Sequence, residues 1–201
     1  MRKALVSLAV IVGLLVVVGL VLVVWGTKTY NRFVALEQRV DQAWADVENA
    51  YQRRMDLIPN LVETVKGVAG FEKETYTAVA EARAQAGSIR ITPELLRDPQ
   101  ALARFDQAQS ALSSALSRLL VTVERYPDLK ANQNFLDLQA QLEGTENRIA
   151  VARRRFNEAV REYNTAIRRL PARLIAGLAG FESRAFFSAA PGAETAPKVE
   201  F

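Results

Sequence analysis

The 201-residue sequence contains no cysteine and no histidine. The absence of cysteine excludes disulfides, thiol nucleophiles, thiolate metal sites and iron–sulfur clusters. The absence of histidine excludes an imidazole base, the commonest zinc ligand and a Ser-His-Asp triad, and it disfavours a di-iron site built on Glu-x-x-His ligands. Carboxylate, lysine and hydroxyl chemistry remain. We predict that the protein is not an enzyme and holds no metal and no cofactor.

Charged residues are absent from residues 4–25, most of which are Leu, Val or Ile. A helix of this length spans about 33 Å, enough to cross a hydrocarbon core of about 30 Å. We therefore predict that residues 1–26 form an uncleaved transmembrane anchor. An interfacial collar of aromatic and basic side chains follows the run directly. It consists of Trp25, Lys28, Tyr30 and Arg32.

Three alternatives to a permanent anchor fit the sequence less well. A cleaved signal peptide has a shorter apolar stretch and a small-x-small exit, whereas this run ends Val-Val-Trp-Gly-Thr-Lys. Lipoprotein processing needs a cysteine, and a buried core helix is rarely so long and uniformly apolar. We expect a single-pass protein of the cell membrane. The charges flanking the run are nearly balanced, but the short basic leader, Arg2 and Lys3, favours a cytoplasmic amino terminus and a domain outside.

Beyond the anchor, apolar residues recur at steps of three and four rather than in alternation, which predicts helices throughout. We expect helices over residues 27–57, 60–86, 100–126 and 134–170, with an irregular linker at 87–99. Pro59 and Pro127 mark the predicted turns because proline disfavours α geometry in the residue before it. The fold class is therefore all-α, and residues 27–170 form an antiparallel, up-and-down four-helix bundle that continues from the anchor.

The last predicted helix has the most regular pattern. One seam position carries mostly large residues and the other mostly small ones, which permits close approach of a neighbouring helix. The two seams are Phe135, Leu142, Ile149, Phe156, Tyr163 and Leu170, and Leu138, Thr145, Ala152, Ala159 and Ala166. On the third helix Gln109 occupies a core-facing heptad position, where it either fixes the helix register or is rotated toward solvent.

The number of helices predicts where the chain ends. If the first helix leaves the membrane, the fourth returns to it, so Leu170 should end near the bilayer surface. Residues 171–187 are then an amphipathic juxtamembrane segment with apolar groups in the lipid and arginines at the headgroups. The predicted membrane contacts are Arg168, Arg169, Arg173, Leu174, Ile175, Leu178, Phe181, Arg184, Phe186 and Phe187. Residues 188–201 are rich in Ala, Pro, Gly and Glu and are predicted to be a disordered tail.

Several short motifs resemble a known family. In the amino half they are Tyr30-Asn31, Ala43-Trp44, the run from Arg53-Arg54 to Asp56-Leu57-Ile58-Pro59-Asn60-Leu61-Val62, and Val65-Lys66-Gly67. In the carboxyl half they are Tyr126-Pro127-Asp128-Leu129-Lys130-Ala131-Asn132, Asn134-Phe135, Thr145-Glu146-Asn147-Arg148-Ile149, Tyr163-Asn164 and Phe186-Phe187. Together they resemble the LemA family over nearly all of residues 1–187.

The resemblance implies a bacterial single-pass membrane protein with a mostly antiparallel helical bundle. No enzymatic activity is associated with the LemA family. Its genes often lie near those of TPM-domain membrane proteins or membrane metalloproteases, so an envelope role follows by analogy. Many members have a histidine before the glutamate at the position of Phe71-Glu72. This chain lacks that histidine, so any role it has elsewhere does not apply here.

Two predicted turns are candidate partner-binding tips at the end of the bundle far from the membrane. The simpler alternative is that they are only turns, in which proline sets the backbone and Asp or Asn satisfies free amides. The tip residues are Asp56, Pro59 and Asn60 in one turn and Pro127, Asp128 and Lys130 in the other.

Positive charge gathers in residues 148–184, which contain nine arginines and three glutamates. The run Arg153-Arg154-Arg155 lacks the aromatic stacking platform of a nucleic-acid site, so we predict no nucleic-acid partner. A solvated helix face is an equally good interpretation of that run. Anionic lipid headgroups are the expected partner of the arginines nearest the membrane.

From these patterns we predict a membrane-anchored envelope scaffold that associates with the membrane and assembles through its bundle faces, with a homo-oligomer as one candidate assembly. The alternative is an adaptor or regulatory partner of another membrane protein, such as a membrane protease or a TPM-domain protein, acting through the distal tips.

Overall fold

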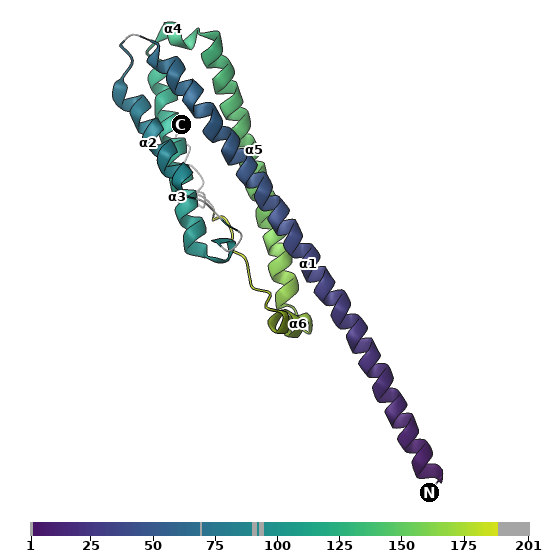
Figure 1. The fold of residues 1–201 in the computed structure, drawn as a ribbon. Helices are drawn as coiled ribbons and strands as arrows, with labels where there is room; N and C mark the ends of the chain where they lie inside the picture. Colours follow the sequence, from purple (N-terminus) through teal and green to yellow (C-terminus); the bar gives the residue numbers. More distant parts are fainter. Residues whose placement is uncertain (1, 69, 90–91, 93–94, 189–201) are drawn as a thin grey trace, which may run out of the picture.

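The computed structural model describes residues 2–68, 70–89, 92 and 95–188, with side chains from residue 10 onward in these ranges. The described part contains six α-helices, one short 3-10 helix and no strand. The predicted all-α fold is confirmed (Figure 1).

Helix α1 (Arg2–Lys66) is one continuous helix of 65 residues, about 98 Å long at 1.5 Å per residue. Its large apolar side chains between Val10 and Val24 are all exposed, and none of the most apolar stretch is buried inside the protein. From Phe33 onward one face of the same helix is buried. The helix is long and apolar enough to cross a membrane, and it continues directly into the bundle as the sequence predicts.

The predicted turn at Ile58-Pro59 does not exist, because α1 passes through Pro59 and ends seven residues later. Proline lacks an N–H, so the carbonyl of Met55, four residues earlier, loses its partner within the helix. Arg83 of the next helix supplies a substitute, with Nε donating to the Met55 oxygen at 2.9 Å. Ile58 and Leu61 are completely buried on either side of Pro59. Tertiary packing and one long-range hydrogen bond therefore keep the helix intact.

The actual first turn includes residues 67, 68 and 70–72, about ten residues beyond the predicted one. Gly70 has a positive φ of 81°, a conformation that glycine adopts without strain. Its carbonyl accepts a hydrogen bond from the Tyr126 hydroxyl at 2.9 Å, and the Phe71 and Tyr126 rings lie 4.8 Å apart. This turn therefore lies against the other distal turn of the molecule.

The remaining helices are α2 (Lys73–Ser88), the 3-10 helix η1 (Leu95–Arg97), α3 (Pro99–Val123), the short α4 (Pro127–Lys130), α5 (Gln133–Arg168) and α6 (Ala172–Ala179). The two longest of these begin at side-chain caps. Asp98 accepts from the Gln100 N–H at 2.8 Å, and Asn132 accepts from the Phe135 N–H at 3.2 Å. The predicted helices at 100–126 and 134–170 match α3 and α5 to within three residues at each end.

Helix α5 lies along α1 for most of the bundle, and the α2–α3 hairpin packs beside them (Figure 1). Helix α4 closes the distal end, and α6 lies at the opposite end, against both α1 and α5. Two core clusters fill the interior. The membrane-side cluster includes Phe33, Trp44, Tyr51, Phe105, Phe156, Tyr163 and Phe187. The distal cluster includes Ile58, Leu61, Val65, Leu112, Leu116, Leu119, Leu129, Phe135 and Leu142.

The seam of large residues predicted on α5 is buried from Phe135 to Tyr163. Leu170 is the exception, with 77 % of its surface exposed, because α5 ends at Arg168. In the small seam, Thr145 and Ala152 are buried. Helix α5 therefore presents the predicted face to α1 and changes direction two residues before the predicted end.

The segment after α5 consists of two different parts. Only Ala172–Ala179 is helical, as α6, and the chain then leaves the helix at Gly180 with a positive φ of 76°. Residues 181–188 form neither helix nor strand and run back onto the bundle. We call residues 181–188 the strap. The predicted disordered tail from residue 189 onward lies outside the described residues.

Candidate functional site

Helix α6 lies beside the point where α1 changes from wholly exposed to partly buried. A methyl group placed on Gly26 of α1 would lie 3.9 Å from Cδ1 of Ile175 in α6. Trp25 of α1 and Leu170 of the α5–α6 turn line the same hollow of about 490 Å³. The chain therefore returns to the end of the apolar run, and contact with the bilayer there stays a prediction.

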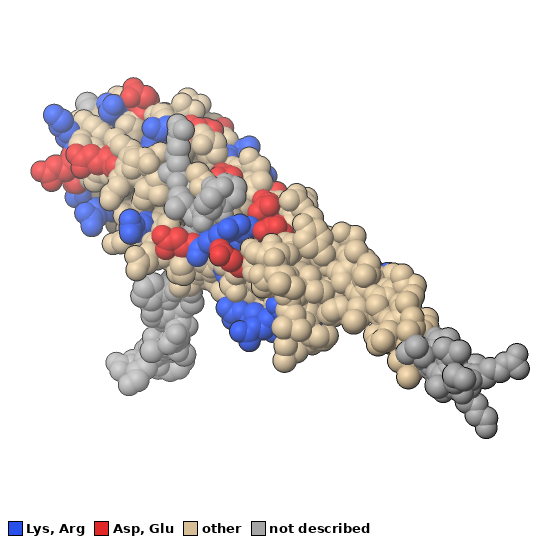
Figure 2. Space-filling model, turned by 60° about the horizontal axis from the view of Figure 1, so that its bottom comes forward, with Lys and Arg blue, Asp and Glu red and all other residues tan. Residues whose placement is uncertain are grey.

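Helix α6 and its preceding turn expose large apolar side chains together with arginines. Leu174 and Leu178 are 66 % and 91 % exposed, and Ile175 is half-buried against α1. Such exposed leucines on one short helix are unusual for a surface that faces water. Arg168, Arg169 and Arg173 are exposed around them. This end of the molecule faces the viewer in Figure 2, where the apolar stretch of α1 is tan along nearly all its visible length and Lys and Arg gather where it meets the bundle.

The strap places the other predicted membrane contacts differently. Phe187 is only 5 % exposed and lies within the membrane-side cluster, and Arg184 is 6 % exposed. Phe181 is half-buried, with its ring 5.5 Å from Tyr30 and 5.3 Å from Phe33. The position predicted for Phe187 and Arg184 is therefore wrong, and of the three phenylalanines of the strap only Phe186 is exposed. The cause is that the chain turns at Gly180 and folds back over the bundle instead of continuing along the membrane.

Two asparagines of α5 hold the strap by its backbone. Asn164 donates from Nδ2 to the Arg184 carbonyl at 2.8 Å and accepts from the Arg184 N–H at 2.9 Å. Asn157 makes the same pair of bonds with Phe187, both at 3.0 Å. On the other side, the Ala185 N–H donates to the Leu96 carbonyl at 2.8 Å. Five hydrogen bonds to main-chain atoms therefore fix a segment that has no secondary structure of its own.

Two strap side chains fill pockets of opposite character. Arg184 Nη2 lies 2.6 Å from Glu37 Oε1 of α1 in an ion pair that is largely shielded from solvent. The Phe187 ring stacks on Trp44 with centroids 6.0 Å apart and packs against Phe156 at 5.5 Å. The guanidinium of Arg153 covers the same ring at 4.4 Å, in cation–π geometry.

A second buried arginine, Arg54 of α1, lies at the centre of the bundle. It is 1 % exposed and donates from Nη1 to Ser113 Oγ at 2.8 Å and to Glu146 Oε1 at 2.7 Å. Its Nη2 donates to the side-chain oxygen of Gln109, and its guanidinium lies 5.1 Å from the Tyr51 ring centre. This cluster ties α1 to α3 and α5. It also answers the question left open for Gln109, which is buried and bonded.

Sequence reasoning missed the Arg54 cluster, although a signal was present. Val47, Tyr51, Arg54 and Ile58 follow one another at steps of four, three and four, so Arg54 lies on the apolar stripe of its helix. A charged residue at such a position needs a partner inside the bundle. The polar residues on the facing seams, of which Gln109 is one, are the corresponding signal.

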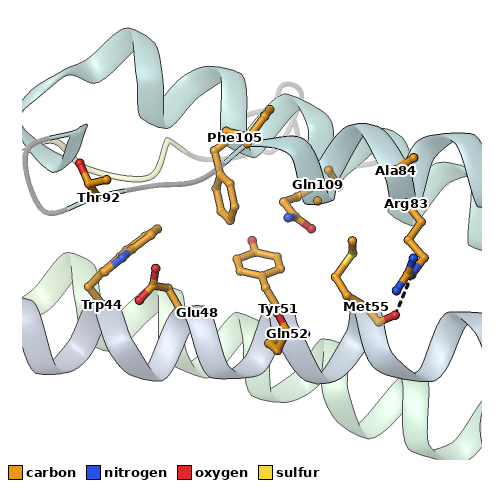
Figure 3. A pocket seen from close by; sticks show the side chains of 13 residues that line it. Trp44, Glu48, Tyr51, Gln52, Met55, Arg83, Ala84, Thr92, Phe105 and Gln109 are labelled. Atoms are coloured by element: carbon orange, nitrogen blue, oxygen red, sulfur yellow. Dashed lines mark hydrogen bonds between the residues drawn. The ribbon is translucent and has the colours of Figure 1, made fainter.

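A cavity of about 680 Å³ lies between α1, α2 and α3, beside this cluster (Figure 3). Trp44, Tyr51, Arg83 and Gln109 point toward it from three helices. Burial raises the pKa of the Tyr51 phenol above its ordinary value of 10.0, although the charges of Arg153 and Arg54 oppose the shift. The phenol therefore stays neutral at physiological pH and acts as a hydrogen-bonding group rather than as an acid.

Of the two predicted partner tips, only one lies in a turn at the distal end. Asp56, Pro59 and Asn60 are exposed but lie within α1, about 10 Å before its end at 1.5 Å per residue. Pro127, Asp128 and Lys130 lie in α4 at the distal end, all exposed. What faces α4 is the turn at residues 67, 68 and 70–72, in which Glu72 forms an ion pair of 2.7 Å with Arg125.

Among the described residues no group of three or more Asp or Glu side chains is placed to hold a metal ion. Several buried polar side chains, among them Arg54, Asn164 and Arg184, join helices to one another or to the strap. The chemistry that the arrangement offers is binding, through the apolar and basic surface at α6 and through the strap pockets.

A long exposed apolar helix that continues into an all-α bundle defines a membrane-anchored helical-bundle protein. The sequence profile of the LemA family matches residues 43–201, and the chain belongs to the LemA family.

The chain is similar to proteins named MamQ and LemA. The chain is 28 % identical to magnetosome protein MamQ of Magnetospirillum gryphiswaldense, over 83 % of this chain and 67 % of that protein. It is 25 % identical to magnetosome protein MamQ 2 of Paramagnetospirillum magneticum over the same shares. With protein LemA of Metamycoplasma hominis the identity is 23 %, over 68 % of this chain and 58 % of that protein. None of these names designates an enzyme.

Proposed function

We propose that this protein is a non-enzymatic scaffold tied to one membrane at two places, by the anchor part of α1 and by α6. The observation that carries the proposal is the position of Leu170, Leu174 and Leu178, which are exposed at the height where the apolar run of α1 ends. Transfer of a leucine side chain out of water contributes about 1.5–3 kcal/mol. The three leucines therefore favour insertion of α6 and its preceding turn into the edge of the bilayer.

The charges around α6 support the same placement. Arg168, Arg169 and Arg173 surround the leucines, and each basic residue near an anionic membrane surface contributes about 1 kcal/mol. With α1 and α6 both at the surface, the bundle cannot swing freely about its anchor. A bundle held at a defined angle presents its faces to neighbours in the same membrane, which suits a scaffold. The amino terminus is proposed to be cytoplasmic and the bundle outside, because of the short basic leader.

Hydrogen exchange of the full-length protein in lipid nanodiscs tests the proposal. The amides of α6 should exchange more slowly in nanodiscs that contain anionic lipid than in nanodiscs of neutral lipid. A variant with Leu174→Ser and Leu178→Ser should lose this protection, whereas Val121→Ser, at an exposed distal position, should keep it. Equal exchange of α6 in detergent and in both lipids would contradict a second membrane contact.

An adaptor role is the second candidate, and one observation favours it. Val121 and Leu136 are 72 % and 41 % exposed, and they flank α4 at the distal end. An apolar pair beside exposed Lys130 and Asp128 suits docking of another membrane protein. Photocrosslinking in cells from position 130, with position 60 as the matched site on the side of α1, distinguishes the candidates. Products that contain only this protein would exclude the adaptor.

A further inference from the structure

The strap and the surface beneath it have the features of a peptide in a peptide-binding groove. The groove is the surface of α1, α3 and α5 beneath the strap. It binds the strap backbone through Asn157 and Asn164, each of which forms hydrogen bonds with both the N–H and the C=O of one strap residue. Seven residues of α5 span about 10.5 Å, and three residues of an extended chain span about 10 Å. The two asparagines are therefore spaced to bind an extended segment at every third residue.

The groove also has pockets for two strap side chains. Glu37 takes the arginine at the first clamped residue, and the wall of Trp44, Phe105 and Phe156 takes the phenylalanine three positions later. Arg153 closes the aromatic pocket from above and is itself held by Asp106 at 2.6 Å. Backbone bonds combined with pockets for alternate side chains are how extended peptides are recognised. The groove thus specifies an extended segment with Arg and Phe separated by two residues.

We propose that this groove also accepts the strap of a second copy of the protein, so that neighbouring copies are joined by strap exchange. Exchange of an identical element preserves every contact just described and is a low-cost route to dimers. Only the origin of the strap changes. The charge and shape complementarity are already present, because the incoming segment has the same Arg184 and Phe187.

The anchor helix favours a second copy over a soluble peptide. The strap begins at α6, beside Gly26, and runs along α5 away from the anchor, from Asn164 to Asn157. Copies inserted in one membrane in the same direction have their grooves at equal height and in parallel. A strap from a neighbour therefore arrives at the correct end of the groove and in the correct direction. The proposal depends on the anchor and not on lipid contact by α6.

The connection between α5 and the strap is long enough for exchange. Twelve residues, 169–180, separate the end of α5 from the strap, and a fully extended chain of that length spans about 40 Å. Two adjacent helices measure about 20–24 Å across, so the strap can reach a neighbouring groove if α6 opens. Gly180, already in a left-handed conformation, gives the chain a flexible point at the start of the strap.

Crosslinking between two single-cysteine chains tests strap exchange, and the cysteine-free sequence gives no background. Ser188→Cys marks the end of the strap, and Gln107→Cys marks α3 beside the same hollow, which Phe186 and Phe187 also line. The two full-length chains, with different tags, are coexpressed and treated with a short bismaleimide in their membranes. As a geometric control, a chain with both cysteines, expressed alone, should crosslink whichever groove its strap occupies: within itself when the strap is on its own bundle, and to its neighbour when the strap is exchanged.

The expected result is a mixed dimer at a yield at least fivefold above that of a control pair, Ser188→Cys with Asn147→Cys. Asn147 is exposed and lines a different hollow between α1 and α5, so it reports random collision. Asn157→Ala in the Gln107→Cys chain should reduce the mixed dimer to the control level. A Phe187→Ala change in the Ser188→Cys chain should do the same.

Excess synthetic peptide of residues 181–188, added before the crosslinker to membranes with equilibrated chains, should also lower the dimer yield. A peptide in which Arg184 and Phe187 are replaced by alanine should not. If the double-cysteine chain crosslinks internally while the mixed pair gives no more dimer than the control pair, the strap binds only its own bundle and the proposal is wrong. A mixed dimer unaffected by Asn157→Ala would likewise overturn it.

Discussion

The two halves of the bundle are held together in different ways. The distal cluster consists mainly of Leu, Val and Ile contributed by helices that follow one another in the chain. The membrane-side cluster is rich in aromatic rings and includes Leu96, Ala185 and Phe187, which lie outside the α-helices. Helix packing alone accounts for the distal half. The membrane-side half needs a segment that arrives from the end of the chain, held by polar side chains.

The two buried arginines show the same contrast. Arg54 is placed by its own helix and joins three helices at the junction of the halves, with Glu146 as its charged partner. Arg184 is placed by the strap and pairs with Glu37 near the membrane. If Arg54 is lost, the whole bundle should be destabilised. If the strap contacts are lost, only the membrane-side half should open.

The largest expected effect follows from Arg54→Ala. Removal of the buried Arg54 side chain leaves a cavity and leaves the buried Gln109 side-chain oxygen without its donor, which together cost about 3–5 kcal/mol, whereas the half-exposed Glu146 carboxylate returns to water. Arg53→Ala, at the exposed neighbouring position, should change the free energy of unfolding by less than about 0.5 kcal/mol. Denaturant unfolding of both full-length variants in detergent micelles measures the difference. Equal stability of the two variants would show that the cluster contributes nothing.

Phe187→Ala should have the next largest effect, and a local one. Loss of a buried phenylalanine costs about 3 kcal/mol, and here the cost falls on the membrane-side half. The amides of Arg184, Ala185 and residue 187 should exchange with deuterium much faster, while the amides of α3 near Leu116 keep their protection. Phe186→Ala is the matched control at an exposed position. Uniform acceleration across the bundle would contradict the division into two halves.

How much the sequence predicts differs between the same two halves. The anchor follows from its unbroken apolar run, and α3 and α5 follow from apolar periodicity, because each of these two helices buries one continuous stripe. The continuation of α1 through Pro59 could not be predicted, because its compensation comes from Arg83, whose role depends on the final packing. The sequence predicts that the strap faces lipid, because its aromatic and basic residues suit a membrane interface as well as they suit the bundle surface. Only the positions of Asn157 and Asn164 on α5 distinguish the two, and asparagines in a helix carry no such signal by themselves.

The hydrogen bond at Pro59 gives a third prediction. Arg83→Ala should destabilise the protein by about 1–2 kcal/mol, because the Met55 carbonyl loses its donor. In a Pro59→Ala background residue 59 regains its N–H, so the same Arg83→Ala change should cost less than about 0.5 kcal/mol. A double-mutant cycle by chemical denaturation measures this coupling. Additive effects of the two substitutions would mean that Arg83 does not substitute for the missing bond.

The smallest expected effect concerns pH. Burial raises the pKa of Tyr51, and burial together with the nearby Glu37 charge raises that of Tyr163. In the unfolded chain both phenols ionise at about pH 10, which is a lower pH than they need in the folded protein. The stability they contribute is therefore complete below about pH 10 and is lost as the pH rises toward the folded pKa values.

Tyr51→Phe should make the decline in unfolding free energy above about pH 10 shallower without removing it, because Tyr163 remains. Unfolding followed from about pH 8 to about pH 11 measures the slope, with Tyr30→Phe as an exposed control. An unchanged slope in Tyr51→Phe would show that this phenol ionises equally readily in both states.

The central claim is that the chain leaves the membrane in α1 and returns to the same surface at α6. Its most direct test is the immersion depth of a nitroxide at position 178, measured by its collisions with oxygen and with a water-soluble nickel complex in bilayers. Leu178→Cys should place the label at the headgroup level, at a depth like that of a label at Gly26→Cys. A label at Leu136→Cys should report water. The same aqueous exposure at position 178 as at position 136 would contradict the account.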